Sequence, residues 1–234
     1  MSNTNSTKDQ EHLPRHRQDT KPLKKQLADY WDYYKIPAII ILLAACMLGS
    51  IFQTMLTQRE TVLSVAYINA FPNINDAQFM EGFNRYLGIN PKKEETLLDS
   101  AYYINENSDS PYTTTYQQKF SAMAMAGKLD VVVADEYYFR FYAHQGFFQD
   151  LSTLLSTEQM QQFEQELLYY DLPDDGKEEA VPVGINVTAA PQIMETDSYP
   201  NTTAYYGVVI YSQYTDNALE FLSYLEAAPD TTAN

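Results

Sequence analysis

The chain has 234 residues, a formal net charge of -16 at pH 7 and a single cysteine, Cys46. A protein with this excess of negative charge repels phosphate backbones, so we do not expect it to bind nucleic acid. One cysteine also excludes an internal disulfide and a cysteine-based metal site. The length is sufficient for one globular domain with a substantial hydrophobic core.

An apolar run without any charge covers residues 36–55. At about 1.5 Å per residue a helix of this length crosses a hydrocarbon core of roughly 30 Å. Seven Lys or Arg and five Asp or Glu precede the run, so the first 35 residues carry +2 and the remainder carries -18. Positively charged flanks stay in the cytoplasm. The sequence therefore predicts a single-pass protein of the cell membrane, with its amino terminus inside and the bulk of the chain extracytoplasmic.

Five segments follow from this topology. We expect a cytoplasmic tail with a juxtamembrane helix at 1–35, a transmembrane helix at 36–57, a tether at 58–61, an extracellular α/β domain at 62–228 and a disordered tail at 229–234. An exported domain without disulfides favours a bacterial surface over a eukaryotic secretory route.

Two interpretations of the apolar run remain open. It is either an uncleaved signal-anchor helix or a processed signal, because Leu43-Ala44-Ala45-Cys46 resembles the lipobox of bacterial lipoproteins. That resemblance implies cleavage before Cys46 and lipidation of its sulfur. The long segment before the run is atypical of a signal peptide, and apolar residues continue to Leu56. Both observations favour the anchor.

Strands and helices alternate along the remainder of the chain. Apolar runs predict strands at 62–68, 97–104, 130–135, 180–188 and 205–211, and helical spacing predicts helices between them and at the end. Asp76, Ser156 and Asp216 are the expected helix caps. We expect residues 189–203 to form an irregular loop. Strands that alternate with helices predict an α/β fold with a mostly parallel five-stranded sheet and flanking helices.

Two stretches resemble a known family. Residues 127–136 (GKLDVVVADE) and 146–151 (GFFQDL) combine a helix ending in glycine, an apolar strand between aspartates and a short turn, and residues 217–225 (NALEFLSYL) follow a late strand. These features are similar to type 2 periplasmic binding proteins, the extracellular solute-binding components of transporters. The resemblance implies the fold of one lobe of such a protein and the capture of a solute. The segment between Phe163 and Tyr205 is too short for a complete second lobe.

The whole arrangement, an aromatic DYWDYYK segment followed by one span and this domain, also resembles uncharacterised membrane-anchored proteins of Gram-positive gut bacteria. That resemblance implies a topology and a fold without implying an activity.

Candidate ligand-binding residues follow the predicted strands. In open α/β sheets, ligands bind beyond the carboxyl ends of the strands. Aromatic, carboxylate and amide side chains at those ends would suit a sugar, a peptide or a cation. The alternative is that the tyrosines after the third strand only seal the sheet against a helix. The candidates are Asn69, Phe71, Asn105, Asp135, Glu136, Tyr138 and Asn186.

Catalytic and metal-binding patterns are weak. The sequence has no Gly-x-Ser-x-Gly, Ser-x-x-Lys, phosphate-loop or His-Glu-x-x-His motif. His144 is expected to be structural, and Asp135 and Glu136 would point to opposite sides of an extended strand. The acidic residues of 174–179 lack the ordered spacing of a calcium loop. We therefore expect no enzymatic activity, no cofactor and no metal.

Three functions are weighed on these grounds. The first is a membrane-anchored extracytoplasmic solute-binding-like domain, acting as a transporter accessory or as a surface solute-capture module. The alternative is a non-enzymatic envelope module for protein–protein assembly, because twenty tyrosines favour a contact surface. A surface hydrolase is third. The expected partners are the membrane and either a small solute or an envelope or transporter protein.

Overall fold

The structure, a computed structural model, describes residues 23–57, 59–104, 111–171 and 180–229. Its compact units are Met1–Leu56 and Thr57–Asn234. The expectations for the tails at 1–22 and 230–234 concern residues outside the described ranges.

The described part of the first unit is one continuous helix, α1 (Leu23–Thr57). The juxtamembrane helix and the span, expected as neighbouring segments, are therefore joined without a break. Residues Tyr34–Gln53 form a stretch that is long and apolar enough to cross a membrane. Length and composition alone support this span, and a signal sequence near the amino terminus has the same properties.

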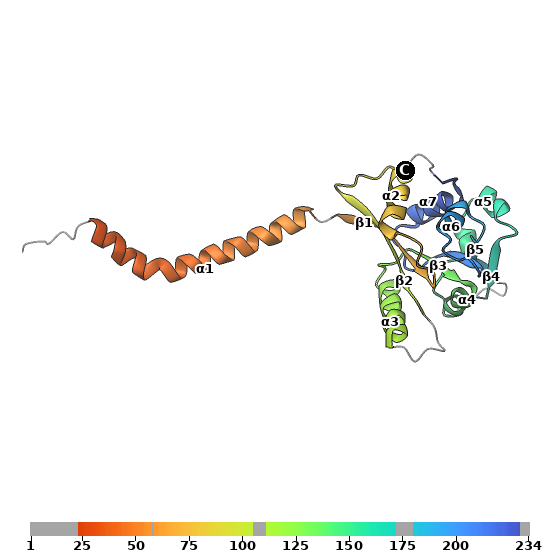
Figure 1. Cartoon of the computed structure of the whole chain (residues 1–234), viewed down its shortest axis with the longest axis horizontal. Helices are drawn as coiled ribbons and strands as arrows, with labels where there is room; N and C mark the ends of the chain where they lie inside the picture. Colours follow the sequence, from red (N-terminus) through yellow and green to blue (C-terminus); the bar gives the residue numbers. More distant parts are fainter. Residues whose placement is uncertain (1–22, 58, 105–110, 172–179, 230–234) are drawn as a thin grey trace, which may run out of the picture. The chain divides into compact units, whose positions relative to one another are not determined.

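A six-stranded mixed sheet forms the centre of the second unit, in the order β2-β1-β3-β6-β5-β4 (Figure 1). β1 is parallel to β2 and β3, whereas the β3–β6, β6–β5 and β5–β4 pairs are antiparallel. The expected five-stranded, mostly parallel sheet is therefore wrong in strand number and direction, although the α/β class is confirmed. The strands are β1 (Glu60–Ile68), β2 (Glu94–Tyr102), β3 (Val131–Asp135), β4 (Leu167–Tyr170), β5 (Val181–Asn186) and β6 (Ala204–Val208).

Two differences account for this correction. β4 lies between the third and fourth predicted strands, where helical spacing predicted only helices, and it pairs with β5 through Leu168 and Gly184. β6 returns between β3 and β5, where Tyr206 lies opposite both Val133 and Ile185. The direction of a strand depends on such long-range pairing, which the local apolar pattern does not encode.

Helices cover both faces of the sheet (Figure 1). On one face Phe83, Ile193 and Phe221 of α2, α6 and α7 pack with strand residues such as Val65 and Tyr206. On the other face α3 and α4 cover the sheet. The helices are α2 (Asp76–Leu87), α3 (Pro111–Met125), α4 (Glu136–His144), α5 (Thr157–Gln162), α6 (Pro191–Thr196) and α7 (Thr215–Glu226).

β1 is buried on both faces, as its continuous apolar sequence predicts. Leu63, Val65 and Tyr67 point to the side of α2 and α7, whereas Ala66 and Ile68 point to the side of α3 and α4. All five side chains are fully or almost fully buried. This central strand therefore belongs to both halves of the core.

The expected helix caps are confirmed at one position of three. Ser156 and Gln159 form the capping box at the start of α5. Asn75, rather than Asp76, caps α2 by accepting a hydrogen bond from the Gln78 N–H. The cap residue of α7 is Tyr214, which makes no side-chain cap bond.

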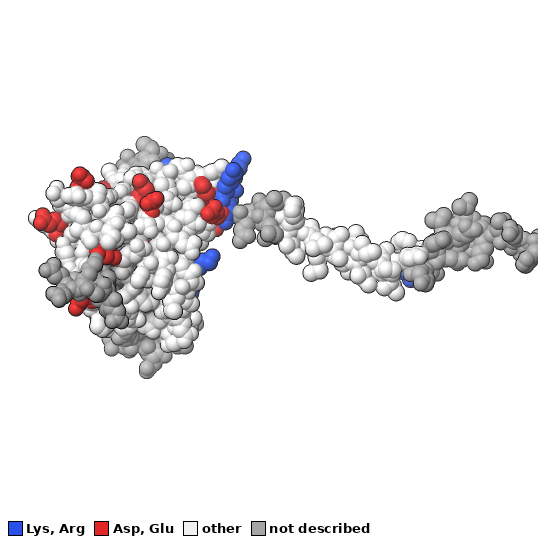
Figure 2. All heavy atoms as spheres, turned by 180° about the vertical axis from the view of Figure 1, so that it is seen from behind, with Lys and Arg blue, Asp and Glu red and all other residues white. Residues whose placement is uncertain are grey.

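Charges are distributed unevenly over the globular unit (Figure 2). In that view the Lys and Arg atoms gather mainly at one side of the visible face, whereas Asp and Glu atoms are spread across it. This asymmetry exists within a unit that is strongly acidic as a whole.

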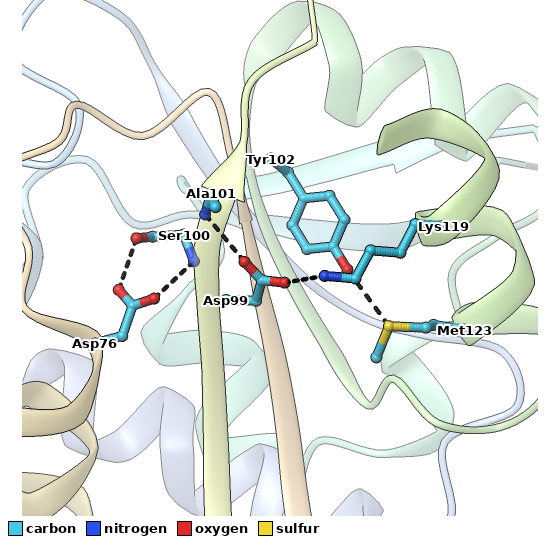
Figure 3. A network of polar contacts seen from close by, with 7 residues as sticks. All are labelled: Asp76, Asp99, Ser100, Ala101, Tyr102, Lys119 and Met123. Carbon is cyan, nitrogen blue, oxygen red and sulfur yellow. Dashed lines mark hydrogen bonds and ion pairs between the residues drawn. The ribbon is translucent and has the colours of Figure 1, made fainter. Parts of the chain in front are cut away.

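Polar contacts attach the edge strand β2 to helices on opposite faces of the sheet (Figure 3). Asp76 at the start of α2 accepts hydrogen bonds from the Ser100 N–H (3.0 Å) and hydroxyl (2.6 Å). Asp99 pairs with Lys119 of α3 at 2.6 Å, and this ammonium lies 4.9 Å from the centroid of the Tyr102 ring. The carboxylate–ammonium hydrogen bond raises the pKa of Lys119. β2 is therefore held from both sides.

Candidate functional site

Three of the predicted ligand residues lie at the carboxyl edge of the sheet, and two of them, Asn69 and Asp135, are in contact. Asn69 follows β1, Asp135 ends β3 and Asn186 ends β5. The Asn69 Nδ2 donates a hydrogen bond of 2.7 Å to Asp135 Oδ2, and its Oδ1 accepts one of 2.7 Å from the Ile104 N–H. Asn69 adopts the left-handed φ of 58°, which asparagine tolerates better than most residues. Its side chain links the ends of the three parallel strands.

The remaining oxygens at this edge also have partners within the protein. Asp135 caps α4 by accepting from the Tyr138 N–H at 3.2 Å. Asn186 Oδ1 accepts from the Thr188 N–H and hydroxyl, and Thr188 Oγ1 accepts from the Ala204 N–H at 2.8 Å. These contacts give the predicted residues structural roles. Their role in ligand binding stays a prediction.

The other four candidates lie in different settings. Glu136 forms an exposed ion pair with Arg140 one turn along α4, and Tyr138 is buried. Phe71 is half exposed, and its N–H donates to the Ser198 carbonyl at 2.7 Å. Asn105 lies outside the described residues.

Tyr199 occupies the position between the ends of β1 and β3. Its hydroxyl lies 3.0 Å from the Ile68 carbonyl and 2.9 Å from the Val133 carbonyl, and the residue is buried. Desolvation by this burial raises the pKa of the phenol well above its usual value. The point where ligands bind in open α/β sheets is thus filled by a side chain of the protein itself.

A groove with a volume of about 720 Å³ lies beside this point. It is formed by α2, α6 and the end of α7, together with the loop that leads from β1 into α2. α2 begins at the carboxyl edge and ends near the start of β2, where the Thr96 hydroxyl bonds to Asn84, so the groove extends along the length of this helix. Its volume lies within the range of clefts that bind small molecules, which makes it the candidate site.

Aromatic rings form one wall of the groove. The Tyr224 ring lies 5.6 Å from that of Phe79 and 5.5 Å from that of Tyr86, measured between centroids. A side chain at Gly82 would place its Cβ 2.5 Å from the Tyr224 hydroxyl oxygen. Glycine at this position therefore lets Tyr224 lie directly against α2. Tyr86 is 47% exposed and presents its ring to solvent.

Polar residues complete the lining. Gln192 is buried and donates to the Ala227 carbonyl at 3.2 Å, which joins α6 to the end of α7. Gln78, Arg85 and Glu195 are exposed on the lining. Arg85 pairs with Glu81 at 3.6 Å on the solvent side of α2. Charged side chains of two different helices, Arg85 with its partner Glu81 and Glu195, therefore lie beside the aromatic rings of the groove.

Sequence reasoning missed this groove. Its side chains lie on the surfaces of three helices far apart in the chain, and no motif connects Tyr86, Gln192 and Tyr224. The only sequence indication was the polar loop after β1, whose residues Asn73 and Asn75 border it. Among the described residues, no three His, Cys, Asp or Glu side chains are placed to hold a metal ion.

Comparison of the chain with protein-family models, with curated proteins and with solved structures found no match. The class that the structure itself defines is an α/β domain with a mixed six-stranded sheet, preceded by one long apolar helix.

Proposed function

We propose that this chain is a membrane-anchored solute-binding module. Its α/β domain would lie outside the cytoplasm and hold a small polar solute, as a surface capture module or as an accessory to a transporter. The groove between α2, α6 and α7 carries the proposal, because it combines an aromatic wall with a few polar groups, as binding sites for small molecules do.

The chemistry of the lining suggests the class of solute. The exposed Tyr86 ring offers a flat face for a sugar or an aromatic group. Arg85 and Glu195 complement a carboxylate and an ammonium, which occur together in amino acids and short peptides. Binding, without a chemical step, is the function that this set of groups supports.

Ligand-dependent stabilisation tests the proposal. The full chain, reconstituted in lipid nanodiscs, is screened by thermal unfolding against sugars, amino acids and short peptides. A ligand at 100 times its dissociation constant stabilises the native state by about 2.7 kcal/mol. Tyr86→Ala should remove the shift, whereas Tyr169→Ala, which truncates a similarly exposed tyrosine on β4, should retain it. The absence of any shift that depends on Tyr86 would refute solute binding in the groove.

A second candidate is the assembly module. Tyr137 and Phe141 are exposed one turn apart on α4, with side chains 59% and 37% accessible. Both rings pack against buried Tyr138, at centroid distances of 5.0 and 6.3 Å. Such supported aromatic side chains are typical of protein contact surfaces. Loss of a partner on Tyr137→Ala, with solute binding unchanged, would favour this function.

A further inference from the structure

The amino edge of the sheet lies at the opposite end of the strands from the carboxyl edge. β1, β2 and β3 are parallel and start at this edge, and Glu60 lies opposite Glu94 in the register. The turn after antiparallel β6 also reaches it, because the Ser212 hydroxyl and the Gln213 N–H donate to Asp130 just before β3. Several separate segments therefore form one surface.

Four cations lie on this surface, each just before a parallel strand. Arg59 precedes β1, Lys92 and Lys93 precede β2, and Lys128 precedes β3. All four are exposed. The Glu60 N–H donates to the Lys93 carbonyl at 2.7 Å, which places the segments of Arg59 and Lys93 side by side.

These cations differ from the others of the domain in having no carboxylate partner among the described residues. Elsewhere in the described domain Arg85, Lys119 and Arg140 each form an ion pair within the protein. This contrast marks the amino edge as the part of the acidic domain where cations without a carboxylate partner gather.

The carboxylates of the same edge already have partners. Glu60 accepts a hydrogen bond from the Tyr214 hydroxyl at 3.0 Å, and Glu94 accepts one from the Asn90 N–H at 2.9 Å. Glu95 accepts from the Thr61 hydroxyl at 3.3 Å. These donors are neutral, so the three carboxylates keep their charges, and the four exposed cations outnumber them by one.

Exposed apolar side chains accompany the cations. Met125 at the end of α3 is 73% exposed, and Ile210 and Tyr211 after β6 are 46% and 56% exposed. The two segments touch, because a Cβ at Gly127 would lie 3.1 Å from the Tyr211 carbonyl. Basic residues beside exposed apolar and aromatic side chains are the composition of a surface that binds a lipid interface.

The connectivity of the chain indicates what binds to the amino edge. The candidate span ends at Gln53, and β1 begins at Glu60, so a few residues join the apolar helix to this edge. We propose that the amino edge of the domain docks on the anionic headgroups of the bilayer that α1 spans, through Arg59, Lys92, Lys93 and Lys128. This docking rests on the membrane anchoring that is part of the proposed function.

Labelling at two matched positions tests the docking. In a Cys46→Ala background, Ala126→Cys at the amino edge and Ala189→Cys at the carboxyl edge each replace an exposed alanine. The full chain is reconstituted in phosphatidylcholine vesicles with or without about one third phosphatidylglycerol, and energy transfer from the label to a headgroup dye is measured. Transfer should rise in anionic vesicles for the label at 126 and stay low at 189. Salt of about 1 M, with a screening length near 3 Å, should reverse the rise.

Charge variants extend the test. Replacing Lys92, Lys93 and Lys128 by Gln should lower the ratio of docked to free domain by about fivefold for each residue. The matched comparison sets Lys92→Gln with Lys93→Gln against Lys119→Gln with Arg140→Gln, which removes the same charge away from this edge and should leave docking unchanged. Equal loss in both double variants would show a general charge effect and overturn the assignment to this edge.

If a charge variant is unstable, the comparison of neutral and anionic vesicles with the chain that keeps all its charges still tests the docking. Equal transfer at 126 in neutral and anionic vesicles, in chains that resist alkaline extraction, would overturn the docking and leave the anchoring intact. Extraction of the chain by alkali would overturn the anchoring, and the docking with it.

Discussion

Two buried tyrosines on the same side of the sheet make opposite contributions. The Tyr199 hydroxyl bonds to carbonyls of β1 and β3, whereas the Tyr67 hydroxyl has no hydrogen-bond partner among the described residues. Their rings lie 6.1 Å apart. Burial raises the pKa of both phenols, so neither ionises at neutral pH. The two neutral hydroxyl groups therefore differ in whether they have a hydrogen-bond partner.

Removing each hydroxyl should separate these contributions. Tyr199→Phe should lower the free energy of unfolding by about 1–2 kcal/mol, because it deletes a satisfied buried hydrogen bond. Tyr67→Phe should be neutral or stabilising by up to about 1 kcal/mol, because it removes a buried polar group that lacks a partner. Thermal unfolding of the full chain, followed by near-ultraviolet circular dichroism, measures both. A larger loss for Tyr67→Phe than for Tyr199→Phe would contradict the assignment.

Glu226 at the end of α7 has a raised pKa. Desolvation by partial burial is the main cause, and the charge of Glu166 adds to it. A folded-state pKa above the unfolded value means that the folded state binds the proton more tightly. The resulting stabilisation is complete below the unfolded pKa, near 4.3, and is lost as the pH rises through the folded pKa.

Glu226→Gln should therefore raise the melting temperature at pH 7 and make little difference at about pH 4, where the native carboxyl is protonated. Melting curves between these pH values measure the effect. Glu220→Gln, at an exposed position of the same helix, is the control and should give a smaller change. A stabilisation by Glu226→Gln that does not change with pH would show that charge is not its cause.

At the scale of elements, two glycines of the sheet leave space for a side chain of α4 to pack against the strands. The Phe139 ring lies over β5 and β6, where a Cβ at Gly184 or Gly207 would approach its ring carbons to 2.5 and 2.8 Å. Phe139 also stacks on Phe148, with centroids 4.2 Å apart. The two antiparallel strands are thus shaped for one aromatic side chain of the helix.

Gly207→Ala should lower the free energy of unfolding by about 1–3 kcal/mol, as overpacking of a core does. If the clash with Phe139 is the reason, Phe139→Leu should reduce the cost of the added methyl group. A double-mutant cycle measured by thermal unfolding gives this coupling, which should exceed about 0.5 kcal/mol. Strictly additive effects would mean that Phe148 or the backbone, rather than Phe139, opposes the methyl group.

The same elements show what local sequence could predict. β1 and β3 were predicted because their continuous apolar runs are bounded by polar residues, and the capping box at Ser156 marks α5 correctly. β4 was missed because Leu167 and Leu168 continue the helical spacing of the preceding segment, and only pairing with β5 makes them a strand. α6 was taken as loop because Pro191 suggested a break, whereas proline is favourable in a first helical turn.

The candidate site was likewise predictable from the sequence only in part. Asn69 follows β1 and Asp135 ends the parallel strand β3, and Asn186 ends β5 at the same edge, but their role in ligand binding stays a prediction. That Tyr199 fills this point could not be predicted, because its contacts with β1 span 131 residues of sequence. The groove depends on how three helices pack, so its lining was equally inaccessible to local patterns.

At the scale of the molecule, the sheet separates two surfaces. The amino edge and the carboxyl edge lie at opposite ends of β1, whose nine residues span about 30 Å. A domain docked by its amino edge would hold Asn69 and Asp135 of the carboxyl edge at about that height above the headgroups. This separation exceeds the screening length at physiological salt, near 8 Å, so the charge of the lipid should not reach the carboxyl edge.

The apolar helix α1 allows the last prediction. It continues through Cys46 to Thr57 without interruption, and its described apolar side chains are exposed. Such a continuous helix suits an uncleaved anchor better than a lipobox, after which a polar tether is expected. We therefore expect the mature protein to retain the residues before Cys46, and Cys46→Ser to stay in the membrane fraction after alkaline extraction. Intact mass and extraction measure both, with Ala45→Ser as the matched control. Loss of residues 1–45 from the parent chain, or selective release of the Cys46→Ser variant, would instead establish a lipid anchor on the cysteine.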